Sequence, residues 1–175
     1  MGRVLLAIDY QNDFVDGALG FAGAERLAPG IVALADEYLE RGDPVIFTLD
    51  THEEDYLQTR EGRYLPVPHC QKGSQGWRLY GPLTKYMDQP YDKVLMCTKP
   101  TFGVQNYGFL KQFQPTQIEL VGLVTNLCVL SNAVVLQTQY PQAELIINSA
   151  LCGSYDKELH EKALDVMRGL QMQVI

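Results

Sequence analysis

A regular alternation of strand-like and helix-like segments constrains this chain more than any other feature. Short apolar runs with β-branched residues recur along the sequence, and amphipathic stretches separate them. Strands are predicted at residues 3–10, 44–50, 92–99, 117–125, 143–150 and 171–175, and helices at 29–43, 104–113, 128–139 and 156–170. Strands that alternate with helices form a mostly parallel sheet with helices on both faces, so the sequence predicts a three-layer α/β fold.

Length and composition indicate an ordinary globular protein with one domain, residues 1–175. The net charge is −7 and no cluster of Lys or Arg stands out, which argues against nucleic acid and anionic membranes as partners. The most apolar windows reach about ten residues, too short for a membrane span, and the apolar run at the N-terminus is too short for a signal peptide. Four cysteines without C-x-x-C spacing or disulfide-scaffold density lead us to expect a reducing, cytoplasmic location.

Residues 51–81 interrupt the alternation, because they contain no clear strand or helix pattern and are rich in Gly, Pro and charged residues. An irregular segment of about 30 residues is uncommon in a compact domain and is usually functional or disordered. This one contains His52, His69 and the only tryptophan, Trp77. We therefore expect it to contribute to a functional site.

Chemically useful side chains stand at the ends of the predicted strands. Asp9, Asp50 and Lys99 lie at the ends of the first three strands, and Cys128 comes three residues after the end of the fourth. The carboxyl ends of parallel strands share one edge of a sheet, where ligands bind in folds of this kind. Alone, each residue has an ordinary structural role, the aspartates as caps, the lysine as a solvated charge and the cysteine as a core side chain. Their coincidence at one edge favours a functional site.

The combination suits covalent acyl transfer. The thiolate is the reactive form of cysteine, and both Lys99 and the N-terminus of a helix starting near Cys128 are expected to lower the pKa of its thiol. Asp9 is placed to accept the thiol proton and to pass it to a departing amine. Backbone N–H groups in the turn "LVTNLC" are expected to face an oxyanion formed on the attacked carbonyl.

A second group consists of Asp50, His52 and His69, with Glu61 between them in the sequence. Alternate residues at a strand end can reach one point, and the long segment can fold His69 back toward it. Carboxylate oxygen and imidazole nitrogen suit Zn²⁺, Fe²⁺ or Mn²⁺. On spacing alone, two histidines in a polar segment are also consistent with ordinary surface positions, and Cys70 is either a competing ligand or a loop residue.

Four motifs, "DYQNDF", "LDTH", "CTKPTFG" and "VGLVTNLCV", resemble in order and position those of the isochorismatase-like cysteine hydrolase superfamily. The resemblance extends over essentially the whole chain. It implies a Rossmann-like sheet of six parallel strands and a catalytic triad of Asp9, Lys99 and Cys128. It also implies a cis peptide bond before Val124, with the N–H groups of Val124 and Cys128 forming the oxyanion hole.

Within the superfamily, Asp50, His52 and His69 resemble the metal site of nicotinamidases, and Glu61 stands near the position of a fourth ligand in some bacterial members. The metal, expected here to be Zn²⁺ with Fe²⁺ or Mn²⁺ as alternatives, holds the pyridine nitrogen of the substrate in those enzymes. The resemblance therefore implies hydrolysis of nicotinamide to nicotinate and ammonia.

Two further positions bear on the substrate. Phe14 and Trp77 are similar to residues that sandwich the substrate ring in nicotinamidases, with the Trp77 match the looser of the two. The chain departs from the commoner pattern where Asn126 replaces the aspartate of D-x-C and where Pro100 follows the lysine. The expected partner is a small carboxamide, and the sequence leaves a homo-oligomer open.

The sequence is also compatible with other functions. The same triad serves isochorismatase-like and N-carbamoyl hydrolases. A metallohydrolase could instead use metal-bound water while Cys128 only packs, and a silent binding protein could retain the fold. Among the remaining candidates, Cys97 is expected to pack in the interior, Cys152 to be either a small buried residue or a loop residue, and His160 to be exposed on its helix.

Overall fold

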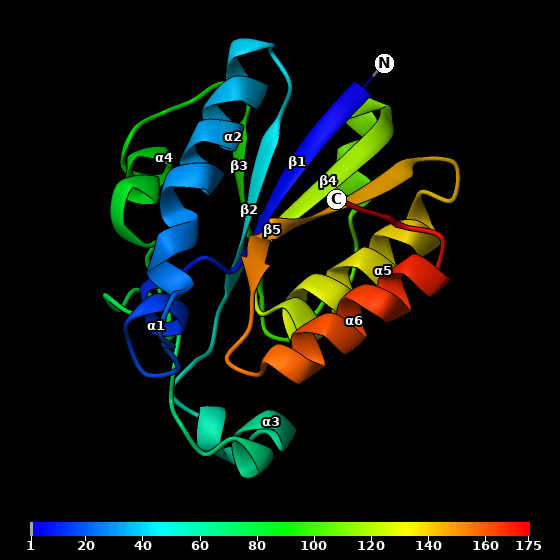
Figure 1. Ribbon diagram of the computed structural model, residues 1–175. Helices are drawn as coiled ribbons and strands as arrows, with labels where there is room; N and C mark the ends of the chain where they lie inside the picture. Colours follow the sequence, from blue (N-terminus) through cyan, green and yellow to red (C-terminus); the bar gives the residue numbers. More distant parts are fainter. Residues whose placement is uncertain (1) are drawn as a thin grey trace.

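A six-stranded parallel sheet forms the centre of the computed structural model, which describes residues 2–175 (Figure 1). Its strands are β1 (Gly2–Ile8), β2 (Val45–Asp50), β3 (Val94–Lys99), β4 (Pro115–Leu123), β5 (Glu144–Gly153) and β6 (Gln173–Val174). The strand order is β3-β2-β1-β4-β5-β6, so the chain winds outward on one side of β1 and then on the other. The change of direction falls between β1 and β4, the place where open α/β sheets leave a crevice for ligands. The predicted α/β fold is confirmed.

Helices cover both faces of this sheet. They are α1 (Asn12–Val15), α2 (Ala28–Glu40), α3 (Arg60–Tyr64), α4 (Lys85–Asp88), α5 (Leu130–Gln139) and α6 (Lys157–Gly169). Figure 1 shows α2 and α4 on one face and α5 and α6 on the other. In the described part of the chain, no helix is long and apolar enough to cross a membrane.

Short helical turns complete the structure. Those of the 3₁₀ type are η1 (Ala24–Leu27), η2 (Tyr56–Gln58), η3 (Gly81–Thr84) and η4 (Gly108–Phe113), and η5 (Thr125–Val129) is a π-helical turn. The helix predicted at 104–113 is reduced to η4. The one predicted at 128–139 is preceded by η5, so that Cys128 lies in a wide turn rather than in the first turn of α5.

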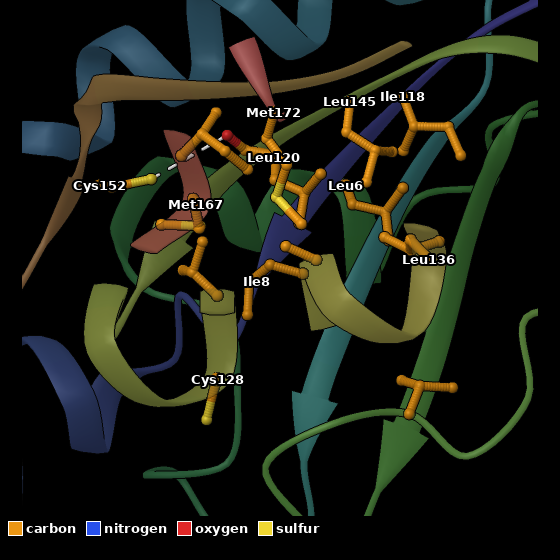
Figure 2. Packing of buried hydrophobic residues seen from close by; sticks show 14 of the residues in the cluster. Leu6, Ile8, Ile118, Leu120, Cys128, Leu136, Leu145, Cys152, Met167 and Met172 are labelled. Carbon is orange, nitrogen blue, oxygen red and sulfur yellow. Dashed lines mark hydrogen bonds between the residues drawn. The ribbon is translucent and has the colours of Figure 1, made fainter. Parts of the chain in front are cut away.

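Alternate residues of the central strand β1 face opposite layers. Leu6 and Ile8 pack with α5 and α6 in the core of Figure 2, whereas Leu5 and Ala7 pack on the side of α2. Side chains of this kind stabilise the fold by about 1.5–3 kcal/mol each when fully buried. The two cores hold the sheet from both sides and fix where its strands end.

The segment that the sequence left without regular structure contains only η2 and α3 before η3. It leaves the carboxyl edge of the sheet after β2, and in Figure 1 it forms the lobe that carries α3. Two isolated bridges return it to the edge, a parallel one between His52 and Gln71 and an antiparallel one between Gln11 and Leu79. His69 is thereby brought beside the end of β2.

Candidate active site

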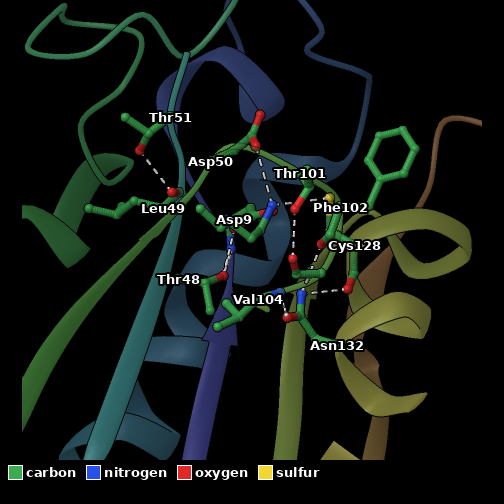
Figure 3. A network of polar contacts seen from close by, with 12 residues as sticks. Asp9, Thr48, Leu49, Asp50, Thr51, Thr101, Phe102, Val104, Cys128 and Asn132 are labelled. Atoms are coloured by element: carbon green, nitrogen blue, oxygen red, sulfur yellow. Dashed lines mark hydrogen bonds and ion pairs between the residues drawn. The ribbon is translucent and has the colours of Figure 1, made fainter. Parts of the chain in front are cut away.

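Four side chains from separate strand ends meet at the carboxyl edge of the sheet. Asp9 follows β1, Asp50 and Lys99 are paired last residues of β2 and β3, and Cys128 lies in η5 after β4. Lys99 Nζ is 2.6 Å from Asp9 Oδ2, 3.3 Å from Asp50 Oδ1 and 3.6 Å from Cys128 Sγ. All four side chains are buried, and Figure 3 shows three of them converging. The expected meeting of these residues is therefore observed.

Thr48, on the neighbouring strand β2, orients the Asp9 carboxylate. Its hydroxyl donates a 2.6 Å hydrogen bond to Asp9 Oδ1 and accepts the Asp9 N–H at 3.1 Å (Figure 3). Asp9 itself has φ of +45°, an uncommon backbone conformation that aspartate tolerates better than most residues. The sequence analysis missed Thr48, although its position two residues before Asp50 on the same strand is a usable signal.

Gln11 holds the end of β2 in place. Its side-chain amide accepts a hydrogen bond from the Asp50 N–H at 2.8 Å and donates to the Asp50 carbonyl at 2.9 Å and the Trp77 carbonyl at 2.8 Å. Gln11 is fully buried, so these bonds satisfy an otherwise costly polar group. This role of Gln11 was not predicted from the sequence.

The charges in this cluster influence one another strongly. Burial works against the charge of Lys99, but the carboxylate of Asp9 and its other anionic neighbours hold the pKa of Lys99 well above its ordinary value. Burial raises the pKa of Asp9, with Lys99 opposing the change. Asp9 is therefore suited to hold and release a proton beside a permanent cation.

The thiol of Cys128 differs from expectation. Burial raises its pKa; Lys99 opposes this rise, whereas the carboxylates of Asp9 and Asp50 add to it. A lowered pKa of this thiol was predicted from Lys99 and the helix terminus alone. The sequence does not show that burial removes the sulfur from water. A thiol of this kind keeps its proton until a base removes it, and the neighbouring Asp9 is such a base.

The predicted metal-binding residues also come together. Asp50 Oδ2 is 2.9 Å from His52 Nε2 and 3.3 Å from His69 Nε2, and the ligand atoms of the three residues lie within 4.8 Å of one another. Glu61 Oε1, carried by α3, is 3.9 Å from the Nε2 atom of each histidine. Burial alone would raise the pKa of Asp50, but hydrogen bonds from both histidines and the Lys99 charge hold it well below its usual range.

The donor set fits a divalent metal ion. His69 Nδ1 donates to the Val67 carbonyl at 2.8 Å, so in the neutral imidazole the proton lies on Nδ1 and Nε2, which faces Asp50, has the lone pair that a metal ligand needs. Two imidazoles and a buried carboxylate are typical ligands of zinc and related ions. Cys70 does not belong to the group, since its backbone N–H donates to Asp13 Oδ2 at 2.7 Å and its side chain packs in the core behind.

A cavity of about 350 Å³ opens beside the Cys128 sulfur. Its lining is mostly apolar and comprises Phe14, Leu19, Gly20, Asp50, Glu61, Leu65, His69, Phe102, Val124, Leu127, Cys128 and Tyr155. The Phe14 ring packs edge-on against the His69 ring at a centroid distance of 5.5 Å, and both residues line the cavity. Leu65 and Tyr155 were missed because no motif surrounds them, and Leu127 was missed although it lies directly before Cys128 in the motif "VGLVTNLCV".

Trp77, predicted to contact the substrate ring, is not part of this lining. Its indole N–H donates to Thr51 Oγ1 at 2.8 Å, and its ring packs against the core on the α2 side. The physical reason is that Gln11 binds the Trp77 carbonyl and Thr51 its indole, which directs the side chain away from the cavity. Of the two ring-binding residues predicted, the structure brings only Phe14 to the cavity.

The turn between β4 and Cys128 has the predicted backbone. The peptide bond between Leu123 and Val124 is cis. The Val124 carbonyl accepts hydrogen bonds from the N–H groups of Leu127 at 3.0 Å and Val129 at 3.2 Å, the residues on either side of Cys128. Val124 and Cys128 both line the cavity, so their backbone lies beside the space that a substrate carbonyl would occupy.

Asn132 ties this turn to the segment after β3. Its amide nitrogen donates to the carbonyls of Cys128 at 2.7 Å and Phe102 at 3.1 Å, and its oxygen accepts from the Val104 N–H at 2.8 Å (Figure 3). The same oxygen accepts from the Tyr107 hydroxyl at 2.6 Å. The residue is fully buried and every polar atom is paired. Nothing in the sequence pattern indicated this role.

His160 also differs from expectation. It is half-buried rather than exposed, and its Nδ1 lies 2.9 Å from Thr125 Oγ1 at the start of η5. Cys97 packs against the core on the α5 side as predicted, and Cys152, visible in Figure 2, takes the buried one of its two expected positions in the same core.

Comparisons with known proteins agree with this geometry. The model of the isochorismatase domain matches residues 3–175. A curated relative, the uncharacterized isochorismatase family protein PncA of Bacillus subtilis strain 168, is 31% identical over 173 residues, which cover 94% of this chain and 93% of the relative. The crystal structure of nicotinamidase PncA from Bacillus subtilis is 30% identical, with a TM-score of 0.88 over 99% of both chains. That of pyrazinamidase/nicotinamidase from Streptococcus mutans UA159 is 26% identical, with a TM-score of 0.87 over 99% of this chain and 100% of its own. The chain therefore belongs to the isochorismatase family.

Proposed function

We propose that this hydrolase of amide carbon–nitrogen bonds converts nicotinamide and water to nicotinate and ammonia, with residues 1–175 working as one domain. The observation that carries the proposal is the position of Lys99, whose Nζ lies between Asp9 and Cys128 at 2.6 and 3.6 Å. The nicotinamide class of substrate is supported by the likeness to the two nicotinamidase structures at 30% and 26% identity.

The first step joins the substrate to the cysteine. Asp9 takes the proton of the Cys128 thiol while Sγ attacks the carboxamide carbon, and Lys99 offsets the negative charge that moves between them. The carbonyl oxygen becomes an oxyanion, and the N–H groups of Val124 and Cys128 stabilise it. Because burial raises the pKa of the thiol, Asp9 is needed as the base that removes its proton.

The second step releases ammonia and then nicotinate. Asp9 passes its proton to the amide nitrogen as the carbon–nitrogen bond breaks, which leaves a thioester on Cys128. Asp9, again a carboxylate, then takes a proton from water as the water oxygen attacks the thioester carbon. The carbon–sulfur bond breaks, the thiolate regains that proton, and nicotinate leaves.

Asp50, His52 and His69 would hold a divalent metal ion, with Zn²⁺ the first choice and Fe²⁺ or Mn²⁺ as alternatives. When bound, the ion supplies a Lewis-acid position that a pyridine nitrogen can occupy. Glu61 faces the same point from α3. Phe14 and Leu127 contribute apolar surface that orients the ring toward Cys128 and excludes water.

A coupled assay of ammonia release tests the proposal with nicotinamide, pyrazinamide and N-carbamoyl compounds as substrates. Isochorismate contains no nitrogen, so its hydrolysis is followed separately by the loss of isochorismate. Nicotinamide should be turned over, and Cys128→Ala should abolish turnover while the metal content of the protein is unchanged. The matched control is Cys97→Ala, a half-buried cysteine on β3 that does not line the cavity and should remain active.

Other outcomes would contradict parts of the proposal. Retained turnover in Cys128→Ala would exclude the thioester route and favour a metallohydrolase in which the cysteine only packs. Turnover of N-carbamoyl compounds or isochorismate alone would retain the triad and replace the substrate.

A further inference from the structure

The turn that contains Cys128 is tied to the junction of β5 and α6 through Thr125, its first residue. The Thr125 hydroxyl lies 3.0 Å from the Gly153 carbonyl at the end of β5 and 2.9 Å from His160 Nδ1 on α6. Thr125 is fully buried and His160 is half-buried. The three groups form one chain of hydrogen bonds behind the turn, on the side away from the substrate cavity.

The direction of these bonds follows from proton counting. A threonine hydroxyl has one proton, and the Gly153 carbonyl can only accept, so the proton of Thr125 is committed to Gly153. Thr125 Oγ1 must then accept from His160, which fixes the proton of the imidazole on Nδ1. His160 is therefore a donor in this contact, and an alanine at that position removes the only donor to the hydroxyl oxygen.

The next residue of the turn is held from the same junction. Ser154 Oγ donates to Asn126 Oδ1 at 2.7 Å and accepts the Asp156 N–H at 3.1 Å, directly before α6 begins. Asn126 is the residue that replaces the aspartate of the commoner D-x-C pattern. Two successive residues of η5 are thus anchored to one short segment, which fixes the turn in both position and rotation.

These anchors lie between the two backbone groups assigned to the oxyanion. Val124 directly precedes Thr125, and Cys128 lies in the same π-helical turn. Stabilisation of an oxyanion requires donors at hydrogen-bond distance from the position that the charged oxygen reaches in the transition state. A small displacement of Thr125 moves both N–H groups relative to the substrate carbonyl, whereas Phe14, which is carried by α1, keeps its place in the cavity.

We infer that His160 is a positioning residue for the reaction: through Thr125, its Nδ1–H holds the Val124–Cys128 turn in the geometry that stabilises the oxyanion. This inference rests on the proposed function, because it needs Cys128 as the nucleophile. It assigns a function to a side chain that has no place in the triad, the metal group or the substrate cavity.

The position of His160 makes the inference testable without unfolding the protein. Its side chain lines a second cavity of about 350 Å³ together with Cys152, Lys157 and Glu161, so it does not fill the core. A smaller side chain at this position extends an existing space. Glu161→Ala, which changes the adjacent residue of the same cavity, is the matched control because the hydrogen bond to Thr125 comes from His160.

The experiment compares His160→Ala, His160→Asn and Glu161→Ala in steady-state hydrolysis. His160→Ala should lower kcat by about 10- to 100-fold, less than the 10²–10³-fold typical of deleting an oxyanion donor outright, and should leave KM within about twofold. Asparagine places an N–H near the position of Nδ1, so His160→Asn should restore most of the lost kcat. Glu161→Ala should behave as the unaltered enzyme.

A transition-state probe separates positioning from a general structural role. Pyridine-3-carbaldehyde adds to a thiol to give a tetrahedral adduct whose oxygen requires the same donors, so its affinity should fall in parallel with kcat. Alkylation of Cys128 by iodoacetamide needs no oxyanion donor, and its rate should change less than about twofold in the same variant. The melting temperature should also stay close to that of the unaltered protein.

Thr125→Val provides a second, independent variant. It keeps the shape of the side chain and removes both hydrogen bonds, so it should reproduce the loss of kcat, and Thr125→Ser should recover it. Because both residues act through one contact, His160→Ala added to Thr125→Val should cause little further loss.

The inference is overturned if His160→Ala retains full kcat, if His160→Asn fails to recover it, or if aldehyde affinity is unchanged while kcat falls. Failure of the proposed function looks different. Retained turnover in Cys128→Ala overturns both proposals, whereas turnover of another amide in place of nicotinamide changes only the substrate, and the His160 variants are then measured with that amide.

Discussion

The hydroxyl of Thr48 donates its only proton to Asp9 Oδ1 at 2.6 Å, although the two residues belong to different strands and stand 39 positions apart. The bond stabilises the charged form of Asp9, and Lys99 lies against the other carboxylate oxygen at 2.6 Å. Each oxygen thus has one partner, which fixes the plane of the carboxylate toward Cys128. The balance between burial, which raises the pKa of Asp9, and these two partners, which lower it, determines when Asp9 can act as a base.

Thr48→Val should therefore raise the pKa of Asp9, since a hydrogen bond to the carboxylate form is lost. The acidic limb of the profile of kcat/KM against pH should move to higher pH, and kcat should fall by about tenfold or more because Asp9 loses its fixed orientation. Thr48→Ser retains the hydroxyl and serves as the control. An acidic limb that stays in place in Thr48→Val would contradict the assignment of Asp9 as the base.

Replacing Lys99 tests the centre of the cluster. Lys99→Met leaves the carboxylates of Asp9 and Asp50 buried without their cation, so we expect the stability to fall by about 3–5 kcal/mol. Activity should fall by about 10³-fold or more, as for loss of a member of a catalytic unit. Urea denaturation and the ammonia assay measure the two effects. Lys111→Met, at an exposed position on η4, should leave stability and activity unchanged. If Lys99→Met were as stable and as active as Lys111→Met, the proposed role of Lys99 would be excluded.

The sequence was sufficient to predict the parallel sheet and the meeting of its strand ends. Apolar runs mark the strands, and the residues that end them are next to one another in any parallel sheet, so Asp9, Asp50 and Lys99 could be placed together without coordinates. The group of predicted metal ligands could be found in the same way, because Asp50 and His52 are alternate residues at one strand end. Its third member, His69, needed the return of a long segment that only the structure describes.

Long-range side-chain contacts could not be predicted in this way. Thr48, Asn132 and His160 act on residues 39, 4 to 30 and 35 positions away, and no local pattern marks them. The pKa of Cys128 was misjudged for a related reason, because desolvation depends on what covers the sulfur. Trp77 was misplaced because the hydrogen bond of its indole N–H to Thr51 Oγ1, 26 positions away, directs it away from the cavity.

Substitution of Asn132 should show how much its fully paired amide contributes. Asn132→Leu keeps the branched shape of the side chain but removes its hydrogen bonds to the Cys128 and Phe102 carbonyls, and a buried group left unsatisfied costs about 1–3 kcal/mol. We expect a loss of about 2–5 kcal/mol in chemical denaturation, together with reduced activity because the Cys128 turn shifts. Gln139→Leu, which removes the bonds of a half-buried side chain to the Tyr107 N–H and the Gln105 carbonyl, should cost less. Equal losses of stability in the two variants would show that the hydrogen bonds of Asn132 contribute no more than those of Gln139.

The metal group makes a graded prediction. His69→Ala removes one of the three buried ligands, and metal content measured by elemental analysis should fall to a small fraction of that of the unaltered protein. Glu61→Gln should cause a smaller loss, since Glu61 Oε1 is 3.9 Å from the two histidines and the residue is less buried. Removal of metal by a chelator should raise KM for nicotinamide, and added Zn²⁺ should restore it. Full metal content in His69→Ala would contradict the site.

A pH effect on stability is expected far from the active site, where α2 meets α4. Asp36 accepts hydrogen bonds from Lys85 Nζ at 2.8 and 2.9 Å and from the Tyr86 hydroxyl at 2.7 Å. Burial opposes the charge of Asp36, but these bonds outweigh the effect of burial. They lower the pKa of Asp36 in the folded protein below the value of about 3.9 that an aspartate has in an unfolded chain. A carboxyl group with a lowered folded pKa stabilises the protein above the unfolded pKa, and the stabilisation is lost as the pH falls through the folded pKa.

Asp36→Asn should therefore be less stable than the unaltered protein at pH 7, and the difference should shrink as the pH falls below about 3.9. Urea denaturation of both proteins across this range measures the difference directly. Glu37→Gln, which breaks an exposed pair with Arg41 on the same helix, is the control and should show only a small effect at any pH. A constant difference between Asp36→Asn and the unaltered protein down to the lowest pH would show that the stabilisation comes from packing against Tyr86 rather than from the charge of Asp36.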